Sequence, residues 1–414
     1  MKLQIRHNLT EQELKKAIVS LAAGGGGEEQ VIKALQRSVC SCEGPKEPRD
    51  PATRELFHRF RGEYQRARKD ILRIIARLIA SVSPKGLHKA LPSTPLTKAQ
   101  IRAIQQAIRD RFELIAAQLQ DDYEPDPDLL LRWQENEWVA PNVTPEDFAL
   151  TVRPEDRYIR NAFVFGRLHQ AVEGGGSYAD IMRRAMTLPL TKPDLQAIAV
   201  AEQQTANYIT ALGDDVAKAA GEIIAAQHRQ TIRDMAVDFH ARKLRARVLD
   251  EDAKRELGLD IPERTVDTWQ GFKSELHQVM EDKSRDWDRV AYYEIHDAKG
   301  QGQALGIIEE LGPKKLVYKM PLPTACPQCK HLYLEDDGTP RLFQIDQLAG
   351  WGNNVGRKPH PIKGGQVVPG GRPDGAETLM PVTGQTHPFC QCLGVYPFTG
   401  HEPWASAKRN NAKV

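Results

Sequence analysis

Two short clusters of metal-binding residue types lie in the last quarter of this 414-residue sequence. The first is Cys326-Pro-Gln-Cys329, and the second is His387-Pro-Phe-Cys390-Gln-Cys392. Two cysteines separated by two residues can direct both sulfurs to one ion from a single turn, and a second cluster must complete a tetrahedron. Thiolates and imidazole suit zinc better than magnesium, calcium or manganese. We therefore predict a structural zinc site with ligands drawn from Cys326, Cys329, His387, Cys390 and Cys392.

The structural character of this site follows from the number of its ligands. Four filled positions leave no place for a bound water or a substrate. Closing the loop of 57 residues between Cys329 and His387 costs roughly 3–4 kcal/mol, whereas a structural zinc site contributes on the order of 10–16 kcal/mol. The sequence leaves open whether His387 or Cys392 takes the fourth position. A disulfide pair and unligated buried thiols are the alternatives to zinc.

The composition is that of a soluble globular protein. Hydrophobic residues make up 40% and charged residues 27% of the sequence, and the length suits two or three domains. The net charge of +2 argues against a protein that coats nucleic acid over its whole surface. No apolar run reaches the roughly 20 residues of a membrane span, and residues 1–7 lack a secretory signal. The six cysteines fit a reducing cytoplasm, and Cys40 and Cys42 are interpreted as incidental thiols.

A long amphipathic helix is predicted over residues 54–82. Apolar residues recur every three or four positions along this stretch, as on one face of a helix. The opposite face is basic and could contact nucleic-acid phosphates, although such a face is also typical of a helix that meets only solvent. The candidate nucleic-acid contacts are Arg59, Arg66, Lys69 and Arg73.

Capping signals divide the neighbouring sequence into further helices. Thr10-Glu-Gln-Glu13 predicts a short N-terminal helix, and Thr97 begins one that runs to Gln120. Thr144-Pro-Glu-Asp147 combines a capping residue, a proline at the first position and an acid at the third. Ser177 and Thr191 begin similar patterns. Residues 174–176 and Gly213 are predicted to separate helices, and residues 214–248 and 262–308 are predicted to be helical.

The pattern changes after residue 311. Residues 315–320 alternate in polarity like a strand, and residues 332–334 and 392–398 are predicted as two further short strands. The predicted fold class is mainly α: an extended multi-helix N-terminal and central region is followed by a small zinc-pinned α+β C-terminal module with a long Gly/Pro-rich loop. The predicted divisions are an N-terminal helix and linker (1–52), two helical regions (53–175 and 176–311), the zinc-pinned module (312–400) and a flexible basic tail (401–414).

The order of motifs in the second half of the chain resembles a known family. Arg289-Val-Ala-Tyr-Tyr-Glu294-Ile-His-Asp-Ala298 in a helix is followed by a strand, then Cys-x2-Cys, then His-Pro-x-Cys-x-Cys. This order is similar to the phage head morphogenesis domain of the Mu gpF-like minor head proteins of tailed phages, and the likeness spans residues 180–398. Tyr292-Tyr293-Glu294 stands where that family usually has Arg-Thr-Glu.

The resemblance implies a minor structural protein of a tailed-phage head, present in few copies and needed for head assembly or genome delivery. The partners that it implies are the portal and/or the major capsid protein, with packaged DNA as a further candidate and without a membrane span. The implied location is the virion, in the head interior or at the portal vertex, after assembly in the host cytoplasm.

Two enzyme classes are the alternatives. A zinc-bracketed nuclease of the HNH kind needs a histidine base and a second, hard metal ion. Asn353, Asn354 and His360 lie between the two cysteine clusters, but they lack an ordered His…Asn…His spacing. An enzyme similar to the ADP-ribosyltransferases would use Glu294 as its acid, but a matching arginine and Ser-Thr-Ser-type strand are not evident. The sequence therefore favours a protein without catalytic residues.

Overall fold

The computed structural model describes residues 47–82, 96–120, 126–248, 268–322, 325–354, 356–363, 366–368, 372, 374–387 and 394–404. The predicted helix after Thr10 lies outside these described residues, as do Cys40, Cys42, Cys390 and Cys392. Residues 405–414 of the predicted tail also lie outside them.

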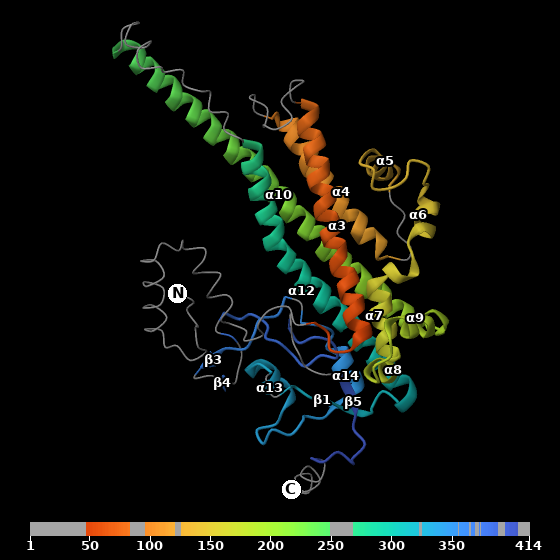
Figure 1. Cartoon of the computed structure of the whole chain (residues 1–414). Coiled ribbons are helices and arrows are strands. Elements are labelled where there is room, and N and C mark those ends of the chain that lie inside the picture. The colour runs from red at the N-terminus through yellow and green to blue at the C-terminus, as the bar shows by residue number, and fades with distance from the viewer. Residues whose placement is uncertain are drawn as a thin grey trace. The chain divides into compact units, whose positions relative to one another are not determined.

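Helices make up most of the described chain, as predicted (Figure 1). They are α3 (Pro51–Val82), α4 (Lys98–Gln118), α5 (Pro127–Glu135), α6 (Pro145–Thr151), the 3-10 helix η1 (Pro154–Asp156), α7 (Tyr158–Arg167), α8 (His169–Glu173), α9 (Tyr178–Thr187), α10 (Lys192–Val248), α12 (Thr268–Leu311), α13 (Pro327–Tyr333) and α14 (Ile345–Gly350). Among the residues described, no helix joins the length to the apolar character that a membrane crossing requires.

The chain forms two compact units, and each combines segments that are distant in sequence. Unit 1 comprises Met1–His58, Tyr158–Ala201 and Arg289–Val414, and unit 2 comprises Arg59–Arg157 and Glu202–Asp288. The cysteine and histidine residues of the predicted metal site belong to unit 1. The candidate nucleic-acid contacts on α3 belong to unit 2.

The helix starts predicted at Thr97, Thr144, Ser177 and Thr191 are confirmed. Thr97 caps α4 and forms a capping box with Gln100, and Thr144 forms one with Asp147 at the start of α6. Ser177 caps α9 in a similar way, and a Thr191–Asp194 pair begins α10. These side chains bond backbone N–H groups that have no partner inside the first helical turn.

The prediction that Gly213 separates two helices is wrong, because α10 continues through it from Lys192 to Val248. The glycine has a packing role instead. A Cβ atom at this position would lie 2.6 Å from Cβ of Phe112 on α4, a distance that real side chains do not reach. Gly213 therefore allows α4 and α10 to approach closely, at the helix-propensity cost of about 1 kcal/mol that glycine carries.

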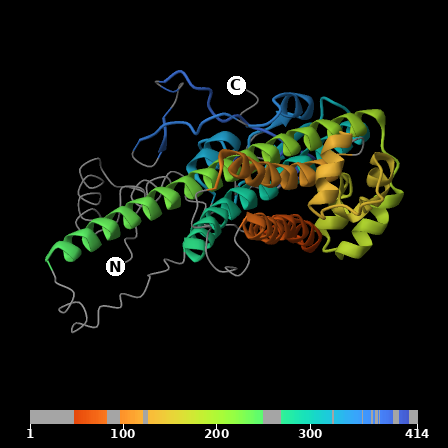
Figure 2. The same ribbon diagram turned by 90° about the horizontal axis from the view of Figure 1, so that it is seen from above.

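Unit 2 contains a bundle built from parts of α3, α4, α10 and α12, together with the shorter helices α5, α6 and η1. Tyr64 of α3 stacks on Trp287 of α12 at 5.5 Å between ring centroids, and it also lies 6.1 Å from the ring of Phe112 on α4. Both views show α10 and α12 side by side (Figure 1 and Figure 2), and Lys283 of α12 lies 2.9 Å from Asp215 of α10. The predicted apolar face of α3 is thus the face that is buried.

Unit 1 contains a small three-stranded antiparallel sheet in the order β2-β1-β5. Its strands are β2 (Phe343–Gln344), β1 (Leu316–Lys319) and β5 (Val395–Pro397), and a separate hairpin pairs β3 (Ile362–Lys363) with β4 (Gln366–Val367). In the register of the sheet, Tyr318 of β1 lies opposite Tyr396 of β5. Val317, Val395 and Ile307 of α12 share one buried cluster. The strand predicted within residues 315–320 is confirmed, and β5 confirms the described part of 392–398.

The strand predicted at residues 332–334 is wrong, because Leu332 and Tyr333 end α13. Pro327 occupies the first turn of this helix, where a proline is well tolerated, and Cys326 precedes it as the N-terminal flanking residue. A run of three residues with apolar ends fits a strand and a helix turn equally well by periodicity. The third strand is instead β2, at Phe343–Gln344.

Candidate metal centre

The first two ligands come from the start of α13. Cys326 directly precedes the helix with extended backbone angles, and Cys329 lies within its first turn. Both thiol side chains are buried, and neither forms a disulfide. The Cys-x2-Cys spacing therefore does locally what the sequence predicted, because one helical turn brings both sulfurs to the same place.

The third ligand arrives from a distant segment. Nε2 of His387 lies 3.1 Å from Sγ of Cys326 and 3.3 Å from Sγ of Cys329. The ligand atoms of all three residues lie within 4.8 Å of one another, and all three residues are buried. The fold thus brings together the two ends of the long segment between the cysteine pair and the histidine.

These distances fit a shared tetrahedral ion. With zinc–sulfur bonds of about 2.3 Å and zinc–nitrogen bonds of about 2.0–2.1 Å, tetrahedral geometry separates nitrogen and sulfur ligands by about 3.6 Å. The distances of 3.1 and 3.3 Å require only a small outward movement of the imidazole. The three residues could therefore hold a metal ion, and their soft donor atoms disfavour magnesium and calcium.

The surroundings of the cluster are apolar. Cys326 and Cys329 pack with Leu332, Tyr333 and Leu379, and Phe343 of β2 borders the same cluster. The predicted ligands Cys390 and Cys392 lie outside the described residues, so the described part of the site holds three ligands. A fourth from either cysteine would close the coordination shell.

The segment that delivers His387 is buried although it has no helix or strand. All six residues 382–387 are buried, and none of them belongs to a helix or strand. Buried backbone N–H and C=O groups need partners. Side chains supply these hydrogen-bond partners here, and three residues, described next, supply most of them.

Lys319 of β1 is the first of these residues. Its ammonium donates to the carbonyl oxygens of Val382 and Thr383, each at 3.3 Å, and to that of Gly384. The side chain is 2% exposed, and its ammonium also lies 5.1 Å from the centre of the Tyr333 ring. A buried lysine is costly unless its charge is compensated, and three carbonyl dipoles together with an aromatic face provide this compensation.

Tyr333 and Asn354 are the other two. The hydroxyl of Tyr333 accepts from the backbone N–H of Val382 at 3.1 Å and lies 2.8 Å from Oγ1 of Thr386. Asn354 donates to the carbonyl oxygens of Met380 and Thr386, and its own carboxamide oxygen accepts from the N–H of Met380 at 2.8 Å. The segment is therefore held at several points before it reaches His387.

Gly384 in the middle of residues 382–387 lies against α12. A Cβ atom on Gly300 would lie 2.6 Å from Cα of Gly384, and a Cβ atom on Gly384 would lie 2.7 Å from Cα of Asp297. Two glycines thus permit a backbone-to-backbone contact that no other residue would allow. Burial raises the pKa of Asp297 to about 6, although the hydrogen bond from Gln301 and the positive charge of Lys319 act in the opposite direction.

Carboxamide side chains make the same kind of contact at two other places in unit 1. Gln303 of α12 donates to the carbonyl of Val395 at 2.6 Å and accepts from its N–H at 3.1 Å. Gln328 of α13 pairs with both backbone groups of His360 at 2.8 and 2.9 Å. In each case the amide side chain takes the place of a neighbouring strand.

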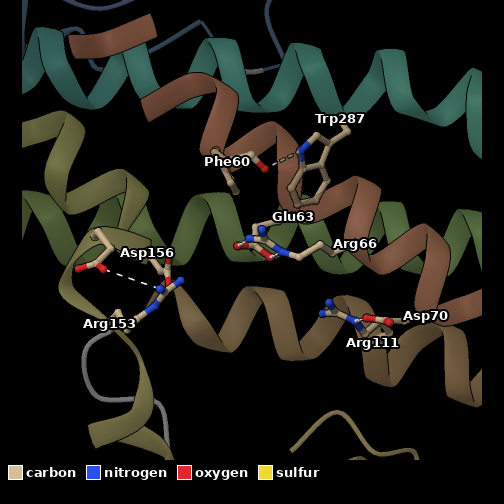
Figure 3. Close-up of polar contacts among 9 residues, drawn as sticks. Phe60, Glu63, Arg66, Asp70, Arg111, Arg153, Asp156 and Trp287 are labelled. Carbon is tan, nitrogen blue, oxygen red and sulfur yellow. Dashed lines mark hydrogen bonds and ion pairs between the residues drawn. The ribbon is translucent and has the colours of Figure 1, made fainter. Parts of the chain in front are cut away.

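Two of the four candidate nucleic-acid contacts of unit 2, Arg66 and Arg73, have acidic neighbours. Nε of Arg66 lies 3.2 Å from Oε2 of Glu63 one turn away on the same helix (Figure 3), and Arg73 lies 3.5 Å from Asp70. Asp70 also accepts from Arg111 of α4 at 3.0 Å (Figure 3). Lys69 is exposed. The basic stripe is thus partly neutralised by carboxylates of the bundle.

The residues weighed for enzymatic alternatives have structural partners. Asn354 holds Met380 and Thr386, and Nε2 of His360 lies 2.9 Å from the carbonyl oxygen of Leu379. Glu294 is buried on α12. Lys319, Tyr333 and Gln303 had not been singled out from the sequence. The alternation of residues 315–320 is compatible with a buried Lys319, but it does not favour this face over that of Leu316 and Tyr318.

Comparisons with known proteins provide no relative for this chain. No family model, curated protein or solved structure matches it.

Proposed function

We propose that this protein is a minor structural component of a tailed-phage head, that it binds the portal or the major capsid protein, and that a structural zinc ion stabilises its C-terminal module. The observation that carries the proposal is the convergence of Cys326, Cys329 and His387 in one buried cluster. The phage assignment rests on the order of motifs around these same residues. A role in assembly requires stable surfaces for partners and needs no catalytic group.

Zinc is the ion that the donor set supports best. Two thiolates and an imidazole match its preference for sulfur and nitrogen ligands. The three ligands are buried among apolar side chains, which suits an ion that stays in place rather than one that exchanges substrates. With Cys390 or Cys392 as a fourth ligand, protein atoms would fill the whole coordination shell.

The proposed role of the ion is to fold the module. It would join α13 to residues 382–387, two parts of the chain that share few regular backbone hydrogen bonds. The described residues between these two parts form only short helices and strands, and their shape would depend on this link. A rigid surface made from such a segment could bind a portal or capsid subunit, whereas an open segment would first have to be ordered at a cost in binding free energy.

Metal analysis of the purified full-length protein tests the zinc assignment. We expect one zinc per chain in the wild type and a loss of most of it in Cys329→Ser and His387→Ala. The matched control is Cys40→Ser/Cys42→Ser, which removes two thiols outside the proposed site and should leave the zinc content unchanged. Wild-type protein without stoichiometric zinc would refute this part of the proposal.

Copurification tests the assembly role. The full-length protein is coexpressed with the portal and with the major capsid protein of the same phage, and each pair is isolated through a tag on the partner. We expect wild type to remain bound to at least one partner and Cys326→Ser/Cys329→Ser to bind less. The assembly role would be refuted if the protein bound neither partner and were absent from mature heads.

A further inference from the structure

Residues 382–387 determine whether the third ligand reaches the cysteine pair. His387 is the last residue of this buried segment, and its imidazole lies within 3.3 Å of both sulfurs. The segment has no helix or strand to hold its path. The position of the histidine must therefore depend on side chains that bind the backbone of the segment.

Lys319 contributes the largest number of these contacts. Its ammonium bonds the carbonyl oxygens of Val382, Thr383 and Gly384, three consecutive residues. Three carbonyls that point to one cation impose a tight curve on the backbone. Gly384 also lies against Asp297 and Gly300 of α12, so the ammonium and the helix both hold the segment.

We propose that Lys319 is a positioning residue of the metal centre, which holds residues 382–384 so that His387 meets Cys326 and Cys329. This inference rests on the proposed metal site. Lys319 acts through the backbone, because its ammonium bonds the carbonyl oxygens of residues 382–384. Loss of the ammonium leaves three buried carbonyl groups without their donor, and the segment should then move away from α12 and carry the histidine with it.

The effect must be reciprocal. If an ordered segment favours metal binding, then metal binding favours the ordered segment by the same factor. Lys319 should consequently be less accessible in the zinc-loaded protein than in the metal-free protein. This second consequence can be measured on the wild type, without any substitution.

The first experiment measures zinc affinity by competition with a chromophoric chelator, using full-length Lys319→Met and the milder Lys319→Gln. We expect about a 10- to 100-fold weaker affinity, as for residues that orient a ligand, and a changed Co²⁺ absorption spectrum. The matched control is Lys299→Met, which removes a part-buried lysine of unit 1 that bonds Asp50 and Thr53 instead. A merely structural lysine would lower thermal stability without altering affinity or spectrum. Helical circular dichroism establishes that each variant is folded.

The second experiment acylates the wild-type protein with an N-hydroxysuccinimide ester and locates the modified lysines by mass spectrometry. We expect Lys319 to be protected when zinc is bound and to react several-fold faster after chelation, while Lys299 changes less than twofold. This result decides the matter if both Lys319 variants fail to fold. Equal protection of Lys319 in both states, or an affinity of folded Lys319→Met within twofold of wild type, would overturn the inference. Wild-type protein that binds no zinc would instead refute the proposed metal site itself.

Discussion

The helical bundle of unit 2 and the metal module of unit 1 satisfy most of their backbone hydrogen-bonding groups in different ways. In unit 2 the helices pair their own backbone groups, so side chains are free to pair with one another, as Arg111 does with Asp70. In the metal module of unit 1, side chains serve the backbone instead, as Lys319 and Asn354 do. The comparison shows that a segment without regular structure can be buried when lysine, tyrosine and carboxamide groups replace the hydrogen bonds of a helix or sheet.

This difference has consequences for stability. A helix distributes its hydrogen bonds over many residues, and the loss of one side chain leaves the backbone intact. In the module, one side chain often holds two or three backbone groups at once. Single substitutions in unit 1 should therefore disturb a whole segment, whereas comparable substitutions in unit 2 should have local effects.

Metal removal should have the largest effect, and it should affect the metal module of unit 1 but not unit 2. A structural zinc contributes on the order of 10 kcal/mol to the domain that it folds. Chelation, or Cys329→Ser, should therefore greatly accelerate amide hydrogen exchange in residues 325–387. Exchange in residues 59–120 should stay unchanged. Hydrogen-exchange mass spectrometry provides the measurement, and equal acceleration in both regions would contradict the distinction.

Loss of the Asn354 carboxamide should have the next largest effect. Asn354→Ala leaves the carbonyl of buried Thr386, and the carbonyl and N–H of half-buried Met380, without this partner, at up to about 1–3 kcal/mol for each group. We expect the opening free energy of residues 380–387 to fall by roughly 3–6 kcal/mol on this basis. The control is Asn207→Ala on α10, an exposed residue that accepts from Gln203 and should change stability by less than about 0.5 kcal/mol. A similar cost for both variants would contradict the comparison.

The buried Asp297 predicts that the stability of unit 1 depends on pH. Burial raises its pKa from 3.8 to about 6, so between these values the folded protein binds more protons than the unfolded chain. The contribution of this carboxyl group to the folding stability is therefore greatest below pH 3.8. It falls as the pH rises to about 6, in total by about 3 kcal/mol. Asp297→Asn should remove this slope.

The measurement for Asp297 is chemical denaturation of wild type and variant at several pH values between 4 and 7, followed by a probe within unit 1. The difference between the two proteins isolates the carboxyl group, because both contain the same metal ligands. A difference that does not vary with pH, or that grows in the opposite direction, would show that the carboxyl group is not the cause.

The smallest expected effect is a packing change in unit 2. Gly213→Ala places a Cβ atom 2.6 Å from Cβ of Phe112, and overpacking of this kind costs about 1–3 kcal/mol. The control in the same helix is Gly221→Ala, where the nearest atom is the mobile end of Gln105. There the gain in helix propensity of about 1 kcal/mol offsets the cost of moving the Gln105 side chain. Thermal unfolding should give Gly213→Ala a lower Tm than Gly221→Ala. The reverse order would contradict the close packing of α4 on α10.

Local patterns in the sequence were sufficient for the helices and for part of the metal site. Thr97, Thr144 and Ser177 begin helices because their side chains bond N–H groups only two or three residues away. The pair of Cys326 and Cys329 is equally local. Residues 332–334 were wrongly predicted as a strand because so short an apolar run fits both periodicities.

The roles of Gly213, Lys319 and Asn354 were decided by the tertiary structure alone. Each depends on an atom more than 25 residues away in sequence: Phe112 for Gly213, Gly384 for Lys319 and Met380 for Asn354. A glycine that permits close packing and a glycine that ends a helix look the same in one sequence. The alternation of β1 could have buried either Val317 and Lys319 or Leu316 and Tyr318. The face with Lys319 is the buried one, because the carbonyls of residues 382–384 bind its ammonium there. The sequence by itself determined which residues could bind a metal ion and where helices begin, because these properties depend on neighbours in the chain. Which distant backbone groups needed a donor was determined only when the chain had folded.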